Sequence, residues 1–114
     1  NSIIHGRKGI SQSEVGFDLA SSETGNYMFD HCILQLANPS DTLDATHFRN
    51  IIFAREGVSY KDIGNYNFDL DTLSPAKDKG LIDYTISVPT DIAGRSRTAD
   101  TKPDLGAFER NEKK

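Results

Sequence analysis

The chain has 114 residues, enough for one domain, and 36% of them are hydrophobic and 26% charged, which excludes an intrinsically disordered chain. No apolar run approaches the roughly 20 residues that a membrane span requires. The net charge is −4 and the basic residues are scattered, so nucleic acid is not an expected partner.

The single cysteine and the first residue bear on the context of the chain. Cys32 is the only cysteine, so we expect no internal disulfide. Because it lies in an apolar run, we expect its small side chain to be buried. The sequence begins at Asn1 rather than at a methionine, and we interpret it as a part of a longer, processed protein.

Three short apolar runs in the first half of the chain each follow a polar residue. They read NSII, HCIL and NIIF and begin at positions 1, 31 and 50, which gives spacings of 30 and 19 residues. β-Branched and aromatic residues dominate these runs and favour strands over helices. Because the runs have comparable settings, we expect stacked repeat units in which Ile3, Ile33 and Ile51 or Ile52 form one column.

Asparagine at the start of two runs indicates tight corners. Asn1 and Asn50 each precede a strand, and asparagine tolerates the left-handed backbone that such a corner needs. Further short strands are expected over residues 16–19, 27–29 and 58–60, whereas residues 42–49 allow one helical turn at most.

Many short strands with few hairpin turns predict an all-β protein, a fragment of a parallel β-helix in which each coil is buried only by stacking. We expect about two to four coils over residues 1–64 and a last coil with an irregular C-terminal cap over residues 65–110. Residues 111–114 are expected to be a frayed tail, and the whole to be one structural domain. The cap is expected to cover the open edge of the last coil, because an unpaired edge invites aggregation.

Three blocks in the second half carry a resemblance to a known family. LSPAKDKG (residues 73–80), DIAGRSR (91–97) and PDLGAFE (103–109) resemble, in this order, three signatures near the end of many bacterial proteins. Those signatures are Ser-Pro-Ala-x-Asp-x-Gly, Asp-x-x-Gly-x-x-Arg and Asp-Ile-Gly-Ala-Tyr-Glu. The proteins are right-handed parallel β-helix, pectate-lyase-like proteins with a choice-of-anchor Q type C-terminal region.

The resemblance covers about residues 65–110, and the chain departs from it at Lys77, Leu105 and Phe108. It implies a right-handed parallel β-helix and an extracellular, cell-envelope or cell-surface location. It implies no substrate, because one fold supports many functions.

The same blocks contain residues for which we expect a structural role in the cap. Pro75 fixes a turn after Ser74, and Asp78 is expected to accept N–H bonds from the loop that ends at Gly80. Arg97 is expected to hold a carboxylate through its planar fork of N–H groups. The expected cap residues are Ser74, Pro75, Asp78, Gly80, Asp91, Gly94, Arg97, Asp104, Gly106 and Glu109.

Four charged residues are the candidates for binding a ligand. Asp69 and Asp71 would share one face of a strand and could hold a cation such as Ca²⁺, although their surroundings fail the EF-hand pattern and a solvated strand face is the main interpretation. Arg95 and Arg97 could bind an acidic sugar, with a structural role as the main alternative. We assign no catalytic residue, no metal site and no cofactor.

Three functions remain open. The favoured one is a non-catalytic C-terminal region of a larger secreted or surface-anchored bacterial protein, joined to upstream coils, for which we consider an association with glycans. The second is a carbohydrate-binding module that stacks sugar rings on Tyr27, Tyr60, Tyr66 or Tyr84. The third is a fragment of a polysaccharide lyase or glycoside hydrolase, which needs clustered carboxylates and a base. Expected partners are polysaccharide and, through the strand edge near residues 1–4, a second copy of the chain.

Overall fold

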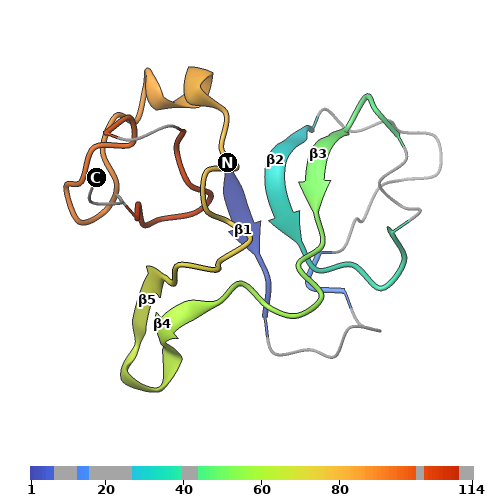
Figure 1. The fold of residues 1–114 in the computed structure, drawn as a ribbon. Helices are drawn as coiled ribbons and strands as arrows, with labels where there is room; N and C mark the ends of the chain where they lie inside the picture. Colours follow the sequence, from blue (N-terminus) through green and yellow to red (C-terminus); the bar gives the residue numbers. More distant parts are fainter. Residues whose placement is uncertain (7–12, 16–26, 40–43, 100–101, 111–114) are drawn as a thin grey trace.

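The computed structural model describes residues 1–6, 13–15, 27–39, 44–99 and 102–110 (Figure 1). Its elements are β1 (Ser2–Ile4), β2 (Phe29–Leu34), β3 (Phe48–Ile52), β4 (Tyr60–Asp62), η2 (Ile63–Asn65), β5 (Asn67–Leu70) and η3 (Ile82–Thr85). In the described ranges no helix has the length and apolar character needed to cross a membrane. The strand expected over residues 16–19 and the tail expected over residues 111–114 lie outside the described residues.

The first three strands form a parallel sheet in the order β1, β2, β3 (Figure 1). Ser2 lies opposite Cys32, and Cys32 lies opposite Ile51. The alignment predicted for the three apolar runs is therefore confirmed, residue for residue. Parallel neighbours cannot be joined by a tight hairpin, in agreement with the long sequence separation of the three strands.

Side chains of this sheet alternate between two buried faces. Ile3, Ile33 and Ile52 pack in one core cluster, whereas Cys32 and Ile51 pack in a second. Of the two alternatives left open for the column, Ile52 is the member, because successive residues of a strand point to opposite faces. Both faces are covered, as parallel sheets require. The remaining buried members of the first cluster come from the C-terminal half of the chain: Val58, Leu70, Ala76 and Leu105.

Like residues stack across β2 and β3. The rings of Phe29 and Phe48 are paired in the register and stack with centroids 5.6 Å apart. His31 and Asn50 both adopt left-handed backbone, with φ of 52° and 53°, between matching paired positions of the two strands. Asn50 Nδ2 also donates to the Asp30 carboxylate at 3.2 Å. The left-handed backbone predicted at Asn50 is thus confirmed, although Asn50 lies inside β3 rather than before it, and His31 repeats this backbone inside β2.

An antiparallel hairpin of β4 and β5 follows the sheet, and it was not predicted. Tyr60 pairs with Leu70 and Asp62 with Asn67, and η2 forms the turn between the strands. The boundary expected between residues 64 and 65 falls inside this turn. The hairpin lacks a two-residue Asn-Gly or Asp-Gly turn and has a bulge, so its sequence carries little of the usual hairpin signal.

The part of the chain after β5, residues 71–99 and 102–110, is the C-terminal segment. It packs on a face of the parallel sheet and contacts β1 (Figure 1). Leu105 is fully buried in the cluster that contains Ile3, and the N–H of Gly106 donates to the carbonyl of Asn1 at 3.3 Å. The Asn1 side chain exchanges two hydrogen bonds with the backbone of Leu81, at 2.9 and 2.7 Å. No strand pairs with the outer edge of β3 in the described part of the chain, although Asp78, Lys79 and Gly80 lie near residues of that strand. The segment also covers the face that bears the Ile3 column, through Ala76 and Leu105.

Candidate functional site

Asp91 is the buried centre of a hydrogen-bond network in the C-terminal segment. Its Oδ1 accepts from the backbone N–H groups of Ala93 and Arg95, at 2.9 and 2.8 Å. Its Oδ2 accepts from Arg95 Nε and from the backbone N–H of Glu109, each at 2.8 Å. The Asp91 side chain is 0% exposed. One carboxylate therefore closes its own loop and ties that loop to the chain near residue 109.

Glu109 is the centre of a second, adjoining set of contacts. Arg97 Nη1 donates to Glu109 Oε1 at 2.7 Å, and Arg97 Nη2 donates to the carbonyl of Gly106 at 3.2 Å. The N–H of Asp104 lies 3.1 Å from each Glu109 oxygen. The predicted pairing of Arg97 with a carboxylate is confirmed, although its fork spans a carboxylate and a carbonyl rather than two oxygens of one carboxylate.

Asp104 takes the role that we expected of Asp78. Its two oxygens accept from the backbone N–H groups of Asp78, at 2.7 Å, and Arg110, at 2.6 Å. Asp78 itself is left-handed, with φ of 56°, and its Oδ1 is buried without a hydrogen-bond partner in the described residues. The prediction that Asp78 accepts N–H bonds from its loop is wrong, because its backbone makes the turn and the Asp104 carboxylate binds the N–H groups.

The other expected cap residues serve turns and close packing. The Ser74 hydroxyl donates to the carbonyl of Val58, and the N–H of Gly80 donates to the carbonyl of Pro103 at 2.8 Å. A Cβ at Gly80 would lie 2.8 Å from that same carbonyl oxygen. Gly94 and Gly106 have φ of 82° and 93°, a region that favours glycine. Pro75 lies in the turn that follows Ser74.

Burial and hydrogen bonding act in opposite directions on these carboxylates. Burial alone would raise the pKa of Asp91, but the N–H groups of Glu109 and Arg95 and the Arg95 guanidinium lower it overall. Burial raises the pKa of Glu109 to about 7, against the lowering effects of the Asp104 N–H and Arg97. The Asp104 carboxylate adds to the raised pKa of Glu109 through charge repulsion.

The structure brings together only two of the four candidate binding residues. Arg95 Nη2 donates to Asp69 Oδ1 at 2.7 Å, and Lys61 Nζ lies 3.8 Å from the other Asp69 oxygen. Asp71 lies beyond the end of β5 and accepts hydrogen bonds from Thr72, so the shared strand face predicted for Asp69 and Asp71 does not form. The fourth candidate, Arg97, is bound to Glu109 and has a side chain only 11% exposed.

An open groove surrounds the Asp69–Arg95 pair. It has a volume of about 530 Å³ and is lined by residues 65–69, Ala93, Arg95 and Phe108. Tyr66 is 83% exposed and Phe68 is 39% exposed. The groove thus combines exposed aromatic rings with carboxylate, amide and guanidinium groups, the mixture found at ligand-binding surfaces.

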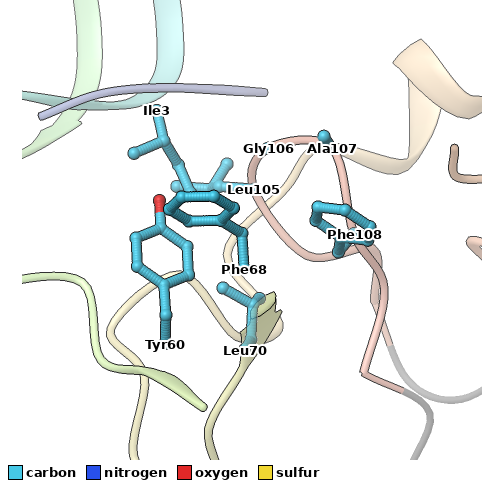
Figure 2. Close-up of a pocket in the computed structure, with 8 residues that line it drawn as sticks. All are labelled: Ile3, Tyr60, Phe68, Leu70, Leu105, Gly106, Ala107 and Phe108. Carbon is cyan, nitrogen blue, oxygen red and sulfur yellow. The ribbon is translucent and has the colours of Figure 1, made fainter. Parts of the chain in front are cut away.

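A smaller apolar pocket adjoins the groove and shares Phe68 and Phe108 with it. It has a volume of about 250 Å³, and its other lining residues are Ile3, Tyr60, Leu70, Leu105, Gly106 and Ala107. Figure 2 shows Ile3 and Tyr60 beside the ring of Phe68, with Phe108 on the other side of the pocket. The rings of Tyr60 and Phe68 meet edge to face, with centroids 5.5 Å apart. The apolar side chains around this pocket come from both the hairpin and β1.

A third hollow, of about 330 Å³, lies beside the left-handed corners of β2 and β3. Its lining includes His31, Asn50, Asp78, Lys79 and Lys102. This hollow is polar and contains both signs of charge.

The described side chains form no recognisable catalytic or metal centre. No group of three or more His, Cys, Asp or Glu is arranged to hold a metal ion within the ranges the structure describes. The charged residues of the segment are instead bonded to one another and to backbone N–H groups. The chain matches no family model, and it matches no curated protein and no solved structure.

Sequence reasoning identified Tyr66 only as one of four tyrosines and did not identify Phe68 or Phe108 as groove residues. The available signal was the alternation of aromatic residues with amides and a carboxylate over residues 65–69. Phe108 could not be placed there from its spacing, because it reaches the hairpin only through the fold of the C-terminal segment.

Proposed function

We propose that the chain is a non-catalytic, structural end region of a larger parallel β-helix protein. The observation that carries the proposal is the residue-for-residue stacking of three parallel strands, with Ile3, Ile33 and Ile52 in one column. Stacked phenylalanines and repeated left-handed corners support it, since like residues at like positions are typical of coils built on a common plan.

The C-terminal segment supports a structural role rather than a catalytic one. The carboxylate oxygens of Asp91, Glu109 and Asp104 accept hydrogen bonds from backbone N–H groups. The guanidinium groups of Arg95 and Arg97 donate to carboxylates. Catalysis by general acid and base needs groups that face a substrate, and these groups face one another. An extracellular or cell-surface location and attachment to upstream coils belong to the same proposal, on the strength of the three sequence blocks.

Turnover measurements test the proposal directly. The chain is incubated with a panel of acidic and neutral polysaccharides, with and without calcium, and the formation of reducing ends or unsaturated products is followed. We expect no cleavage by the wild-type chain or by a variant with Asp69→Asn and Asp71→Asn. Calcium-dependent cleavage that this variant loses would overturn the proposal and place a lyase or hydrolase site at these carboxylates.

A further inference from the structure

Tyr66 presents a large aromatic ring to solvent from a costly backbone conformation. The residue follows η2 in the hairpin turn with φ of 58°, and its side chain is 83% exposed. A non-glycine residue in the left-handed region costs about 1–2 kcal/mol, and an exposed ring recovers none of this by burial. Glycine or asparagine would make the same turn more easily. The ring therefore contributes nothing evident to folding and is available for contact with a ligand.

Polar groups with spare hydrogen-bonding capacity lie next to this ring. Asn67 Oδ1 accepts the N–H of Asp69 at 3.1 Å, and the amide NH₂ of Asn67 has no partner in the described part of the chain. The Asp69 side chain is 28% exposed and retains lone pairs beyond its contacts with Arg95 and Lys61. The groove therefore offers one donor and one strong acceptor beside an aromatic face.

The charges in the groove are balanced. Arg95 donates to Asp69 at 2.7 Å and to Asp91 at 2.8 Å, so its single positive charge already faces two carboxylates. An anionic ligand would meet the Asp69 carboxylate, and the two cations beside it, Arg95 and Lys61, already face carboxylates. A cationic ligand would meet Arg95 and Lys61 instead. The balance favours a neutral ligand that is rich in hydroxyl groups.

We infer that this groove binds a neutral sugar residue of an oligosaccharide. The apolar C–H face of the sugar stacks on Tyr66, while neighbouring hydroxyls donate to Asp69 and accept from Asn67. Phe68 and Phe108 form the apolar wall of the groove. The acidic sugar considered for Arg95 and Arg97 does not fit, because both guanidinium groups are paired with carboxylates. This binding activity goes beyond the structural role proposed above and does not rest on it.

Nuclear magnetic resonance titration of the isotope-labelled chain tests the inference and detects weak binding. The probes are soluble oligosaccharides of glucose, mannose, xylose and galactose, with oligogalacturonate as the acidic counterpart. We expect at least one neutral oligosaccharide to shift the amide signals of residues 65–69 saturably. Oligogalacturonate is expected to bind more weakly than that oligosaccharide.

Variants at two exposed tyrosines separate the groove from general surface binding. Tyr66→Ala should weaken binding by about tenfold or more, since loss of an aromatic stack costs about 1.4 kcal/mol. Tyr84→Ala is the matched control, because Tyr84 is 46% exposed and lies outside the groove lining. Its binding should equal that of the wild type, and urea denaturation confirms that both variants fold.

Three results would overturn the inference: no saturable shift with any neutral oligosaccharide, a preference for oligogalacturonate, or equal binding by Tyr66→Ala. None of them would affect the proposed structural role, which fails only if the chain cleaves a polysaccharide.

Discussion

Asp91→Asn is the substitution that most directly tests how the C-terminal segment is held. The asparagine side chain has the same shape, but one oxygen becomes an NH₂ donor. Each Asp91 oxygen accepts two hydrogen bonds, so whichever oxygen is replaced, two N–H donors then face a third donor. The two surviving hydrogen bonds are made to a neutral rather than a charged acceptor.

The expected loss follows from these contacts. A hydrogen bond to a charged group contributes about 1.5–3 kcal/mol, so two lost bonds amount to roughly 3–6 kcal/mol. Removing a buried charge returns part of this, because the charge no longer has to be desolvated. We therefore expect the free energy of unfolding to fall by about 3 kcal/mol, against a total of roughly 6–17 kcal/mol for a chain of 114 residues.

Urea denaturation followed by circular dichroism measures the effect. With a typical slope, the midpoint should fall by roughly 1–2 M. Asp83→Asn is the control, since Asp83 is an exposed residue of η3, and its midpoint should stay at the wild-type value. If Asp91→Asn lowers the free energy of unfolding by less than about 1 kcal/mol, the view that this carboxylate organises the segment is refuted.

Other predictions concern Glu109, Gly106 and Asp78. Because the pKa of Glu109 is raised from 4.5 to about 7 in the folded chain, folding retains a proton over this range and stability should fall as pH rises through it; Glu109→Gln should flatten that slope in urea titrations at a series of pH values. Gly106→Ala should cost about 2–4 kcal/mol, because φ is 93° and the added Cβ would lie 2.7 Å from Ile3 Cδ1. Measured against Ile3→Val alone, which lacks that Cδ1 atom, Gly106→Ala should cost less in thermal denaturation, and an undiminished cost would show that the contact with Cδ1 is not its source. Asp78→Gly should raise stability by about 1 kcal/mol, since it relieves a left-handed residue and removes a buried oxygen without a partner; a loss of stability would mean that the carboxylate has a stabilising role.

The stacking of the first half could be predicted because it depends on local patterns. A polar corner residue followed by two or three apolar residues recurs three times, and like segments stack in register. The choice of Ile52 over Ile51 for the buried column needed the pairing itself, since neighbouring residues of a strand point to opposite faces. In the C-terminal segment, the structural role of the charged residues and the pairing of Arg97 with a carboxylate could be predicted, because oppositely charged side chains in a compact loop form ion pairs.

The hairpin, the groove and the placement of the C-terminal segment could not be predicted. The hairpin is local but lacks a two-residue Asn-Gly or Asp-Gly turn. The groove and the placement of the segment depend on contacts between residues that are far apart in the sequence, such as Asn1 with Leu81 and Asp69 with Arg95. No periodic pattern encodes such pairs. The role of Asp104 was missed for a related reason: its carboxylate accepts the N–H of Asp78, which lies 26 positions away in the sequence.

The packing of Leu105 and Gly106 on Ile3 has a consequence for folding during synthesis. β1 completes its apolar contacts only with residues that are synthesised about a hundred positions later. Until residue 105 has emerged from the ribosome, the face of the sheet that bears Ile33 lacks one of the side chains that cover it. A nascent or truncated chain lacking that residue is therefore expected to bind chaperones that recognise exposed apolar surface, and contacts of such long sequence separation should make folding slow.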